Sequence, residues 1–431
     1  MPNEYSQLKS AQNFTNLHPN KKFAMTTVSD AEKIILSQAK DYGSELIPFE
    51  NALGRVLAEA LTADRDLPPC NRVTMDGIAI SHAAFESGIK TFRIIGTMPA
   101  GVQPIEITNP NECVEIMTGA ALPDTTDTII RYEDIEIKNG IATLLTDKIT
   151  KGQSIHYKGK DKKQGDVVAP ANEYITPAHI SMAASVGKSM LLVKKLPKVV
   201  IISTGDELVD VTERPTPYQV RRSNSYAVKA ALQQHGLHAD TLHIPDEPNE
   251  TRTQIEKCLT QYDVIILSGG ISMGKFDYVP QALEELKVEK LFHKVEQRPG
   301  KPFWFGAHAS GVLVFAFPGN PVSTFMCLHR YFLPWLKKSL ISPSPLGEGR
   351  GEALYAILNE DITFSAPLQY FAQVKLKRCK HGHLHATPIE GHGSGDFANL
   401  LNTDAFIELP LEQSVFKKDE VYPIWPFKNI F

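Results

Sequence analysis

The sequence has few of the features that mark membrane, disulfide-rich or nucleic-acid-binding proteins. None of its apolar runs approaches the length of a membrane span, so we expect no membrane association. Its five cysteines are scattered and form no C-x-x-C pair, which argues against a disulfide framework or a zinc cluster and favours a reducing, cytoplasmic location. With 45 Lys and Arg against 49 Asp and Glu, the formal net charge is −4, which argues against broad electrostatic binding to nucleic acid.

The N-terminal stretch is polar and contains no apolar segment of the kind found in a secretory signal. We expect residues 1–24 to form a disordered tail, with Met25 as an alternative start of the protein. The length of 431 residues exceeds one ordinary core and predicts several domains.

Apolar periodicity divides the first half of the chain. Helical periods cover residues 28–40 and 49–61, and a third helix is predicted at 176–187, with Pro177 in its first turn and Gly187 at its end. Between them, short β-like runs alternate with Gly, Pro and Asp. The pattern predicts a β domain at 63–161, inserted into an extended helical/β framework made of residues 25–62 and 162–195, to which the resemblance described below adds a role in dimerisation.

The segment 196–340 repeats strand, loop and helix. Strands are predicted at 198–203, 239–244, 263–267 and 311–317, and helices at 225–235, 250–262, 280–287 and 321–340. Continuous apolar strands separated by helices indicate a doubly wound α/β domain with a parallel sheet covered on both faces. Residues 341–352 are predicted to be a linker, and 353–431 a C-terminal β domain.

The topology predicts where a ligand binds, because the carboxyl ends of parallel strands meet at one edge of a sheet. The residues that follow the four strands are glycines, prolines, carboxylates and small polar residues: Gly205, Asp206 and Glu207; Asp246 and Glu247; Ser268, Gly269, Gly270, Ser272, Gly274 and Asp277; and Pro318, Gly319, Asn320 and Pro321. Glycine loops and helix N-termini bind phosphate, and carboxylates beside phosphate indicate a divalent cation, usually magnesium. Arg298 and Lys301 add positive charge suited to anionic oxygens.

Each of these loops has a simpler interpretation when taken alone. The glycine loop is neither G-x-G-x-x-G nor a Walker A motif, and an isolated loop of this kind is more often a tight turn. The aspartates fit helix caps or Asx turns. Only the convergence of four such loops on one edge favours a site.

Three turns elsewhere have similar composition. Asp76 lies in a Met-Asp-Gly turn, Thr118 follows a β-like run, and Asp161 lies in a basic, glycine-containing turn. The "HGSGD" stretch at 392–396 fits either an anion site at Ser394 or a plain turn. The "HGHLH" stretch at 381–385 fits exposed strand positions better than a metal site.

Eight motifs occur in order between residues 28 and 340: "LGRVLAE", "TMDGIAI", "IMTGAALP", "STGDELV", "SNSYAV", "SGGISMGKFDYV", "RPGKPFWFG" and "PGNPVST". In combination they resemble the molybdopterin molybdenumtransferases of the MoeA family, which includes the E domain of gephyrin. The α/β segment alone is similar also to molybdopterin adenylyltransferases and to a domain of competence/damage-inducible proteins.

The resemblance implies an enzyme that takes adenylylated molybdopterin and molybdate, places molybdenum on the dithiolene sulfurs and hydrolyses the pterin–AMP anhydride with Mg²⁺. It implies a homodimer, with the active cleft between the α/β domain of one subunit and the inserted β domain of the other. It also implies an upstream molybdopterin adenylyltransferase that supplies the adenylylated substrate. Carried over position by position, it implies catalytic carboxylates at Asp76, Asp161, Glu207, Asp246 and Asp277, the last three also binding the metal. It implies substrate-binding roles for Thr118, Ser268, Gly269, Gly270, Ser272, Gly274, Arg298, Lys301, Pro318, Asn320 and Ser394.

Several positions depart from the family pattern: Val73, Thr74 and Ile78 flank Asp76 where the family has Ser, Ala and Tyr, and the linker carries an insertion. Lys160 replaces a glutamate and Gln373 replaces an arginine. Two other functions remain open at this point. One is a pterin or nucleotide adenylyltransferase or pyrophosphatase built on the α/β domain, and the other is a non-catalytic scaffold of the gephyrin kind.

Overall fold

The computed structural model describes residues 25–271, 278–341 and 353–428. These residues form two compact units, one containing the chain up to Tyr42 together with Leu196–Phe431, and the other containing Gly43–Lys195. None of the helices in the described ranges has the length and apolar character needed to cross a membrane. The division falls at Tyr42, within the segment 25–62 that the sequence grouped with residues 162–195.

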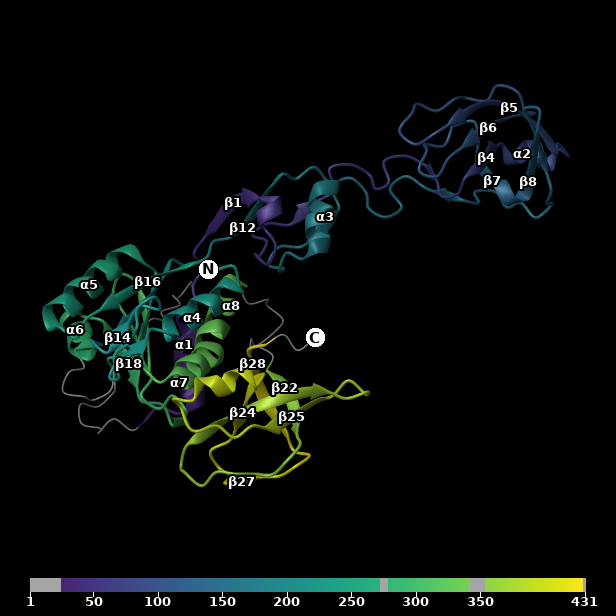
Figure 1. Ribbon diagram of the computed structural model, residues 1–431. Coiled ribbons are helices and arrows are strands. Elements are labelled where there is room, and N and C mark those ends of the chain that lie inside the picture. Colours follow the sequence, from purple (N-terminus) through teal and green to yellow (C-terminus); the bar gives the residue numbers. More distant parts are fainter. Residues whose placement is uncertain (1–24, 272–277, 342–352, 429–431) are drawn as a thin grey trace, which may run out of the picture. The chain divides into compact units, whose positions relative to one another are not determined.

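The larger unit contains a six-stranded sheet of order β16-β13-β17-β21-β20-β18. Its two edge strands, β16 and β18, are labelled in Figure 1. The strands are β13 (Val199–Thr204), β16 (Ala239–Ile244), β17 (Val264–Ser268), β18 (Glu289–His293), β20 (Trp304–Ala307) and β21 (Leu313–Phe317). The first four strands in the sheet order are parallel, and β20 and β18 add an antiparallel edge. The predicted parallel sheet is therefore confirmed, and each of its four strands lies within two residues of the expected bounds.

Helices cover both faces of this sheet, as its continuous apolar strands require. The helices are α1 (Val28–Ser37), α4 (Asn224–Gln233), α5 (Pro248–Gln261), α6 (Val279–Glu285), α7 (Pro321–Cys327) and α8 (Leu333–Leu340). Helices α5 and α6 pack on one face, where Ile255 and Leu283 share a core with Val200 and Ile265. Helices α1, α4, α7 and α8 lie on the other face (Figure 1), where Phe315 packs against Trp335 with ring centroids 5.5 Å apart.

The predicted single helix at 321–340 is interrupted. A π-helical segment, Leu328–Phe332, joins α7 to α8. Pro334 lies in the first turn of α8 and has no backbone N–H to donate, which accounts for the change in hydrogen-bond pattern just before it.

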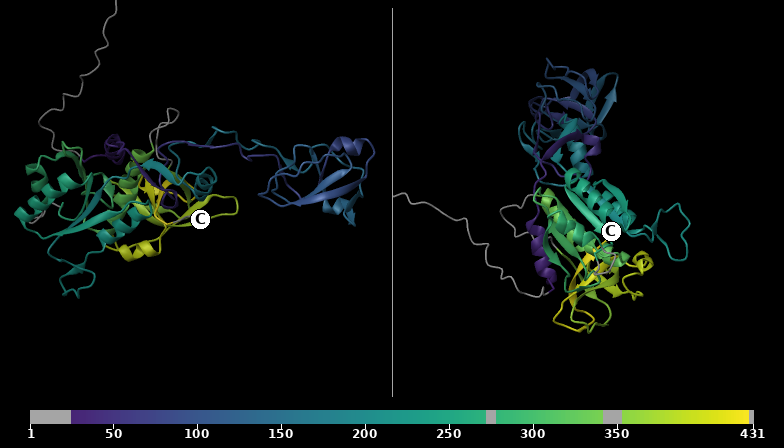
Figure 2. Two further views of the ribbon diagram at one scale, coloured as in Figure 1. Left: turned by 90° about the horizontal axis from the view of Figure 1, so that it is seen from above. Right: turned by 90° about the vertical axis from the view of Figure 1, so that its left-hand side faces the viewer.

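The C-terminal strands form a second sheet in the same unit, coloured yellow-green to yellow in Figures 1 and 2. Its order is β19-β24-β25-β22-β28-β26, with β24 also pairing β26. The strands are β19 (Gln297–Arg298), β22 (Leu354–Leu358), β24 (Gln369–Arg378), β25 (Leu384–Pro388), β26 (Ala405–Leu409) and β28 (Val421–Pro426). Strand β19 comes from the α/β segment and pairs in parallel with β24. The predicted C-terminal β structure is confirmed.

Short elements complete this unit. They are β14 (Leu208–Val209) paired with β15 (Val220–Arg221), β23 (Ile362–Thr363) paired with β27 (Val415–Phe416), and the 3₁₀ segment η4 (Phe397–Leu401).

The smaller unit contains the inserted β structure. One sheet has the order β7-β4-β6-β5-β9-β8, formed by β4 (Gly77–Ile80), β5 (Thr91–Met98), β6 (Glu112–Ile116), β7 (Thr128–Arg131), β8 (Ile135–Lys138) and β9 (Ile141–Leu144). Three two-stranded ribbons accompany it: β1 (Ser44–Pro48) with β12 (Met190–Lys194), β2 (Leu61–Thr62) with β11 (Val167–Ala169), and β3 (Arg72–Val73) with β10 (Ile155–His156). Helices α2 (His82–Glu86) and α3 (Pro177–Ser185) and the 3₁₀ segments η1 (Phe49–Asn51) and η2 (Tyr132–Asp134) complete it.

The predicted helix at 49–61 is wrong. Only Phe49–Asn51 is helical, as one 3₁₀ turn, and Gly54 follows at a φ of +78°. The backbone N–H of Leu57 donates to Glu173 and that of Ala58 to Leu192. Hydrogen bonds to residues distant in sequence thus replace the helical ladder, while the apolar side chains of Ala52, Leu57 and Leu61 still enter the core.

A buried ion pair joins three parts of the larger unit. Arg330, in the π segment, is 3% exposed and donates to Glu408 of β26 at 2.9 Å and to Glu32 of α1 at 3.0 Å. Glu408 also accepts from Trp425 and Gln369. The network therefore connects the N-terminal helix, the π segment and the C-terminal sheet.

We expect Arg330→Met to destabilise the larger unit by about 3–5 kcal/mol, because it leaves the buried Glu408 carboxylate without a cation. Urea unfolding monitored by tryptophan fluorescence measures this loss. Glu32→Gln is the matched comparison and should cost under about 1 kcal/mol, since that carboxylate is more exposed. Equal effects of the two substitutions would contradict this assignment.

Candidate functional site

A cavity of about 940 Å³ lies at the carboxyl ends of the parallel strands. We call it the glycine-loop pocket. Its walls come from the loops after β13, β16, β17 and β21, with part of the β14–β15 ribbon and the loop before η4. The predicted residues that line it are Glu207, Asp246, Ser268, Gly269, Gly270, Pro318 and Asn320. The four-loop convergence expected from the topology is therefore confirmed.

The backbone of the glycine loop is fixed by its neighbours. Gly269 and Gly270 have φ of +97° and +67°, a region that favours glycine, and a Cβ on Gly270 would lie 2.5 Å from the Thr204 hydroxyl oxygen. The N–H of Gly269 donates to the carbonyl of Phe317. The loop thus brings its main chain, rather than side chains, to the pocket surface.

Asn224 connects two of the loops. Its amide nitrogen lies 2.9 Å from the Ser268 hydroxyl oxygen and 2.7 Å from the Gly319 carbonyl oxygen. Asn224 is the first residue of α4 and also lines the pocket. Sequence reasoning noted the "SNSYAV" motif but assigned this side chain no role.

The two described acids of the pocket follow two adjacent strands. Glu207 follows β13, and its carboxylate turns back over Gly205, where a Cβ would lie 2.4 Å from Oε2. Asp246 follows β16, and its backbone N–H donates to the Asp206 carboxylate at 3.0 Å. His243 Nε2 donates to the Gly205 carbonyl at 2.9 Å, which further fixes the loop that carries Glu207.

These acids are suited to a divalent cation only in part. Within the described ranges, no group of three or more His, Cys, Asp or Glu is arranged to hold a metal ion. Magnesium usually takes one or two protein carboxylates and substrate phosphates, so Glu207 and Asp246 beside the glycine loop are compatible with it. Ser272, Gly274 and Asp277 lie outside the described residues, so the three-carboxylate set stays a prediction.

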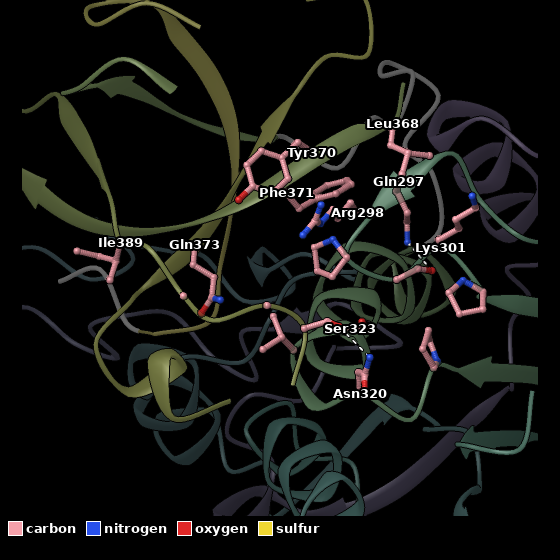
Figure 3. Close-up of a pocket in the computed structure, with 18 residues that line it drawn as sticks. Gln297, Arg298, Lys301, Asn320, Ser323, Leu368, Tyr370, Phe371, Gln373 and Ile389 are labelled. Atoms are coloured by element: carbon pink, nitrogen blue, oxygen red, sulfur yellow. Dashed lines mark hydrogen bonds between the residues drawn. The ribbon is translucent and has the colours of Figure 1, made fainter. Parts of the chain in front are cut away.

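A smaller cavity of about 360 Å³ adjoins the first and shares Pro302, Pro318 and Asn320 with it. We call it the cationic pocket. Arg298, Lys301 and Ser394 line it, as do Tyr370 and Gln373 of β24. Figure 3 shows Arg298, Gln373 and Asn320 around the same cavity.

Side chains of the cationic pocket are held by aromatic and hydrogen-bond contacts. The Arg298 guanidinium lies 5.7 Å from the centre of the Phe364 ring, which stacks on Tyr370 at a centroid distance of 4.2 Å. Asn320 Nδ2 donates to the Ser394 hydroxyl at 2.8 Å. The predicted anion-binding residues Arg298, Lys301 and Ser394 are thus brought together here.

The remaining predicted residues lie in the smaller unit. Asp76 Oδ1 accepts from the Thr118 hydroxyl at 2.7 Å and from its backbone N–H at 2.6 Å. These two bonds, the hydroxyl first, lower the pKa of Asp76. The structure therefore pairs two residues that the sequence placed in separate turns.

Asp161 has a partner that sequence reasoning missed. His156 Nε2 lies 2.8 Å from its carboxylate, and the Arg72 guanidinium lies 3.3 Å from Nδ1 of the same ring. An arginine only donates, so Nδ1 accepts and the proton of the neutral ring is on Nε2, directed at Asp161. Pairing of β3 with β10 places Arg72 opposite His156, a register that no local motif indicates.

We expect Thr118→Val to raise the pKa of Asp76 toward its ordinary value, because the hydroxyl donor is lost while the backbone donor stays. Carboxyl ¹³C NMR titration measures the change, and Thr118→Ser, which keeps the hydroxyl, should leave the pKa low. An unchanged pKa in the valine variant would show that this hydrogen bond does not control the ionisation of Asp76.

Comparison with known proteins agrees with this architecture. Residues 26–187 match the MoeA N-terminal region (domain I and II), 200–338 a probable molybdopterin binding domain, and 355–427 the MoeA C-terminal region (domain IV). The chain is 36% identical over 404 residues to the molybdopterin molybdenumtransferase of Synechocystis sp., covering 93% of this chain and 100% of that protein. It is 29% identical to that of Bacillus subtilis, covering 89% of this chain and 90% of the relative.

Among solved structures, a molybdopterin biosynthesis MoeA protein from Pyrococcus horikosii aligns with a TM-score of 0.79 at 27% identity. The alignment covers 94% of this chain and 100% of that one. Sequence, domain order and fold agree over nearly the whole length, and we conclude that this chain belongs to the MoeA family of molybdopterin molybdenumtransferases.

Proposed function

We propose that this protein inserts molybdenum from molybdate into adenylylated molybdopterin, releasing AMP and leaving molybdenum on the dithiolene sulfurs. The observation that carries the proposal is the pair of adjoining cavities in the larger unit. One presents glycine-loop backbone and two carboxylates, and the other presents Arg298 and Lys301. These two environments suit two ligands: a substrate that contains a phosphoanhydride, and a co-substrate that is an oxyanion.

The glycine-loop pocket suits the anhydride. Its main-chain surface at Gly269 and Gly270 accommodates close approach of phosphate oxygens, and Asn224 keeps the two flanking loops in register. Glu207 and Asp246 would hold Mg²⁺, with Asp277 as the third predicted ligand, and the bound ion would supply positive charge to the anhydride oxygens. Asp206 and His243 position the loops that carry Glu207 and Asp246.

The cationic pocket suits a tetrahedral oxyanion, either molybdate or the phosphate on the pterin. Arg298 is oriented by the Phe364 ring, and the Ser394 hydroxyl, held by Asn320, supplies a neutral hydrogen-bonding group. Gln373 replaces the arginine of the family pattern and keeps an uncharged donor at this wall. Arg298 and Lys301 therefore carry the positive charge contributed by the described lining of this pocket.

The proposed reaction does not require a covalent enzyme intermediate. Water attacks one phosphorus of the anhydride, and the bond from that phosphorus to the bridging oxygen breaks. The products are AMP and the pterin, which keeps its own phosphate. The substrate is held by the two pockets, so catalysis consists of positioning and electrostatic stabilisation of the developing negative charge. Carboxylates such as Glu207 also orient the attacking water.

The five described cysteines are unpaired, which supports a reducing compartment such as the cytoplasm. We further propose a homodimer in which Asp76, Thr118 and Asp161 of one copy act with the two pockets of the other. These three residues lie in the smaller unit, and all pocket-lining residues lie in the larger one.

We expect the purified protein with Mg²⁺ to release AMP from adenylylated molybdopterin only when molybdate is present. Glu207→Gln should slow this release by about 100-fold or more, the loss typical of removing a group that stabilises reacting charge. Glu213→Gln is the matched control, since this exposed acid lies outside both pockets. AMP release at the same rate with and without molybdate would indicate a pyrophosphatase. Tight binding of the substrate without AMP release would indicate a scaffold.

Mixed dimers test the second part of the proposal. Asp76→Asn and Glu207→Gln are each expected to be inactive alone, whereas mixing and re-equilibrating the two variants should restore up to about a quarter of wild-type activity, because half of the dimers are mixed and each has one intact site. Analytical ultracentrifugation confirms the oligomeric state. Absence of any recovery in verified mixed dimers would show that each copy builds its site alone.

A further inference from the structure

Phe397 is a large apolar side chain beside the charged groups of the glycine-loop pocket. It lines the glycine-loop pocket and is 52% exposed. It is the only aromatic residue among the described residues that line this pocket. None of the ring–ring contacts within the described ranges involves it, so the ring is not part of the aromatic core of the larger unit.

The loop that carries this ring is braced. The Asp396 carboxylate accepts from the backbone N–H of His392 at 3.0 Å, which closes the turn before η4. The N–H of Val322 donates to the carbonyl of Ser394 at 3.1 Å, and Asn320 donates to its hydroxyl. The turn is therefore fixed against the start of α7, and Phe397 is presented to the pocket from a supported position.

The composition of the pocket limits what covers the ring. Its other walls combine leucine, valine and proline side chains with charged and polar groups, among them Glu207, Arg221, Arg222, Asn224 and Asp246. An exposed phenyl ring beside such groups favours a ligand that is flat and apolar on its face and polar at its edge. Heteroaromatic rings have this character, and stacking on an aromatic side chain is tolerant of their substituents.

We propose that Phe397 stacks on a planar heterocycle of the adenylylated substrate, so that the attached phosphates reach the glycine loop. This inference rests on the proposed function, whose substrate carries two such rings, a pterin and an adenine. The shared chemistry is a heteroaromatic ring with a phosphate on one side. Phe397 would recognise the ring inside the glycine-loop pocket, whose walls also carry the carboxylates of Glu207 and Asp246.

Leu401 supplies the matched control. It lies four residues later in the same 3₁₀ segment and is 79% exposed, and it does not line the pocket. If a protein surface covered this region, both Phe397 and Leu401 would be expected to contribute. If a small-molecule ring covers it, only Phe397 contributes to binding.

The experiment compares four variants of the full chain: Phe397→Ala, Phe397→Leu, Phe397→Tyr and Leu401→Ala. Dissociation constants are measured by calorimetry for AMP and for adenylylated molybdopterin, with Mg²⁺ present and molybdate omitted. We expect the alanine and leucine variants at position 397 to weaken binding of the substrate by about 10-fold or more, the usual range for loss of one aromatic stack. Phe397→Tyr and Leu401→Ala should bind as the wild type does.

The two ligands identify the ring. Weakened binding of both AMP and substrate assigns the stack to adenine, and weakened binding of the substrate alone assigns it to the pterin. Unchanged affinity in Phe397→Ala overturns the inference, as does wild-type affinity in Phe397→Leu, which would mean that apolar volume suffices. Equal losses in Leu401→Ala, or altered oligomeric state, would assign the region to a protein interface instead.

Failure of this inference is distinguishable from failure of the proposed function, because binding is measured without turnover. If the Phe397→Ala and Phe397→Leu variants bind the substrate more weakly but the wild type releases no AMP with molybdate, the ring site is supported and the proposed reaction is contradicted. If all four variants insert molybdenum normally and bind the substrate with unchanged affinity, the proposed reaction is supported and the ring site is contradicted.

Discussion

The parallel pairing of β13, β17 and β21 is the constraint on which the rest of the site depends. Parallel strands in register end at the same edge, so the three loops that follow them must share one surface. Each loop emerges from a buried strand and has to change direction at once, which explains the glycines and prolines at these points. That geometry brings main chain to the pocket surface, and the acids after β13 and β16 add negative charge beside it.

The loops are fixed by a second set of contacts, side-chain hydrogen bonds that each contribute little stability alone. The Asn224 amide spans two loops, the Asp206 carboxylate joins the β13 loop to the β16 loop, and Asn320 with Ser394 joins the α/β part to the C-terminal part. None of these groups is required by the secondary structure. Their common effect is that the walls of both pockets are set before a substrate arrives, which lowers the cost of ordering them on binding.

The strands and helices of the α/β part could be predicted because their signals are local. Continuous apolar runs mark buried parallel strands, and the order of elements places their ends together. The segment 49–61 could not be predicted, because its apolar spacing is compatible with a helix while its N–H groups pair with residues 173 and 192. The same reason explains the missed His156, whose role depends on the β3–β10 register. It also explains Phe397, since the turn before it is held by contacts with Asn320 and Val322 at the start of α7.

Strand β19 has a consequence for how this chain is built. Gln297 and Arg298 follow β18 in the α/β segment, yet their backbone pairs with Gln369 and Tyr370 of the C-terminal sheet. Gln297 is fully buried, and Tyr331 of the π segment donates to its side chain. The C-terminal strands therefore complete a wall that begins in the α/β segment: a chain cut at residue 341 would leave β19 without its neighbour β24 and would remove Tyr370 and Gln373 from the pocket that Arg298 lines.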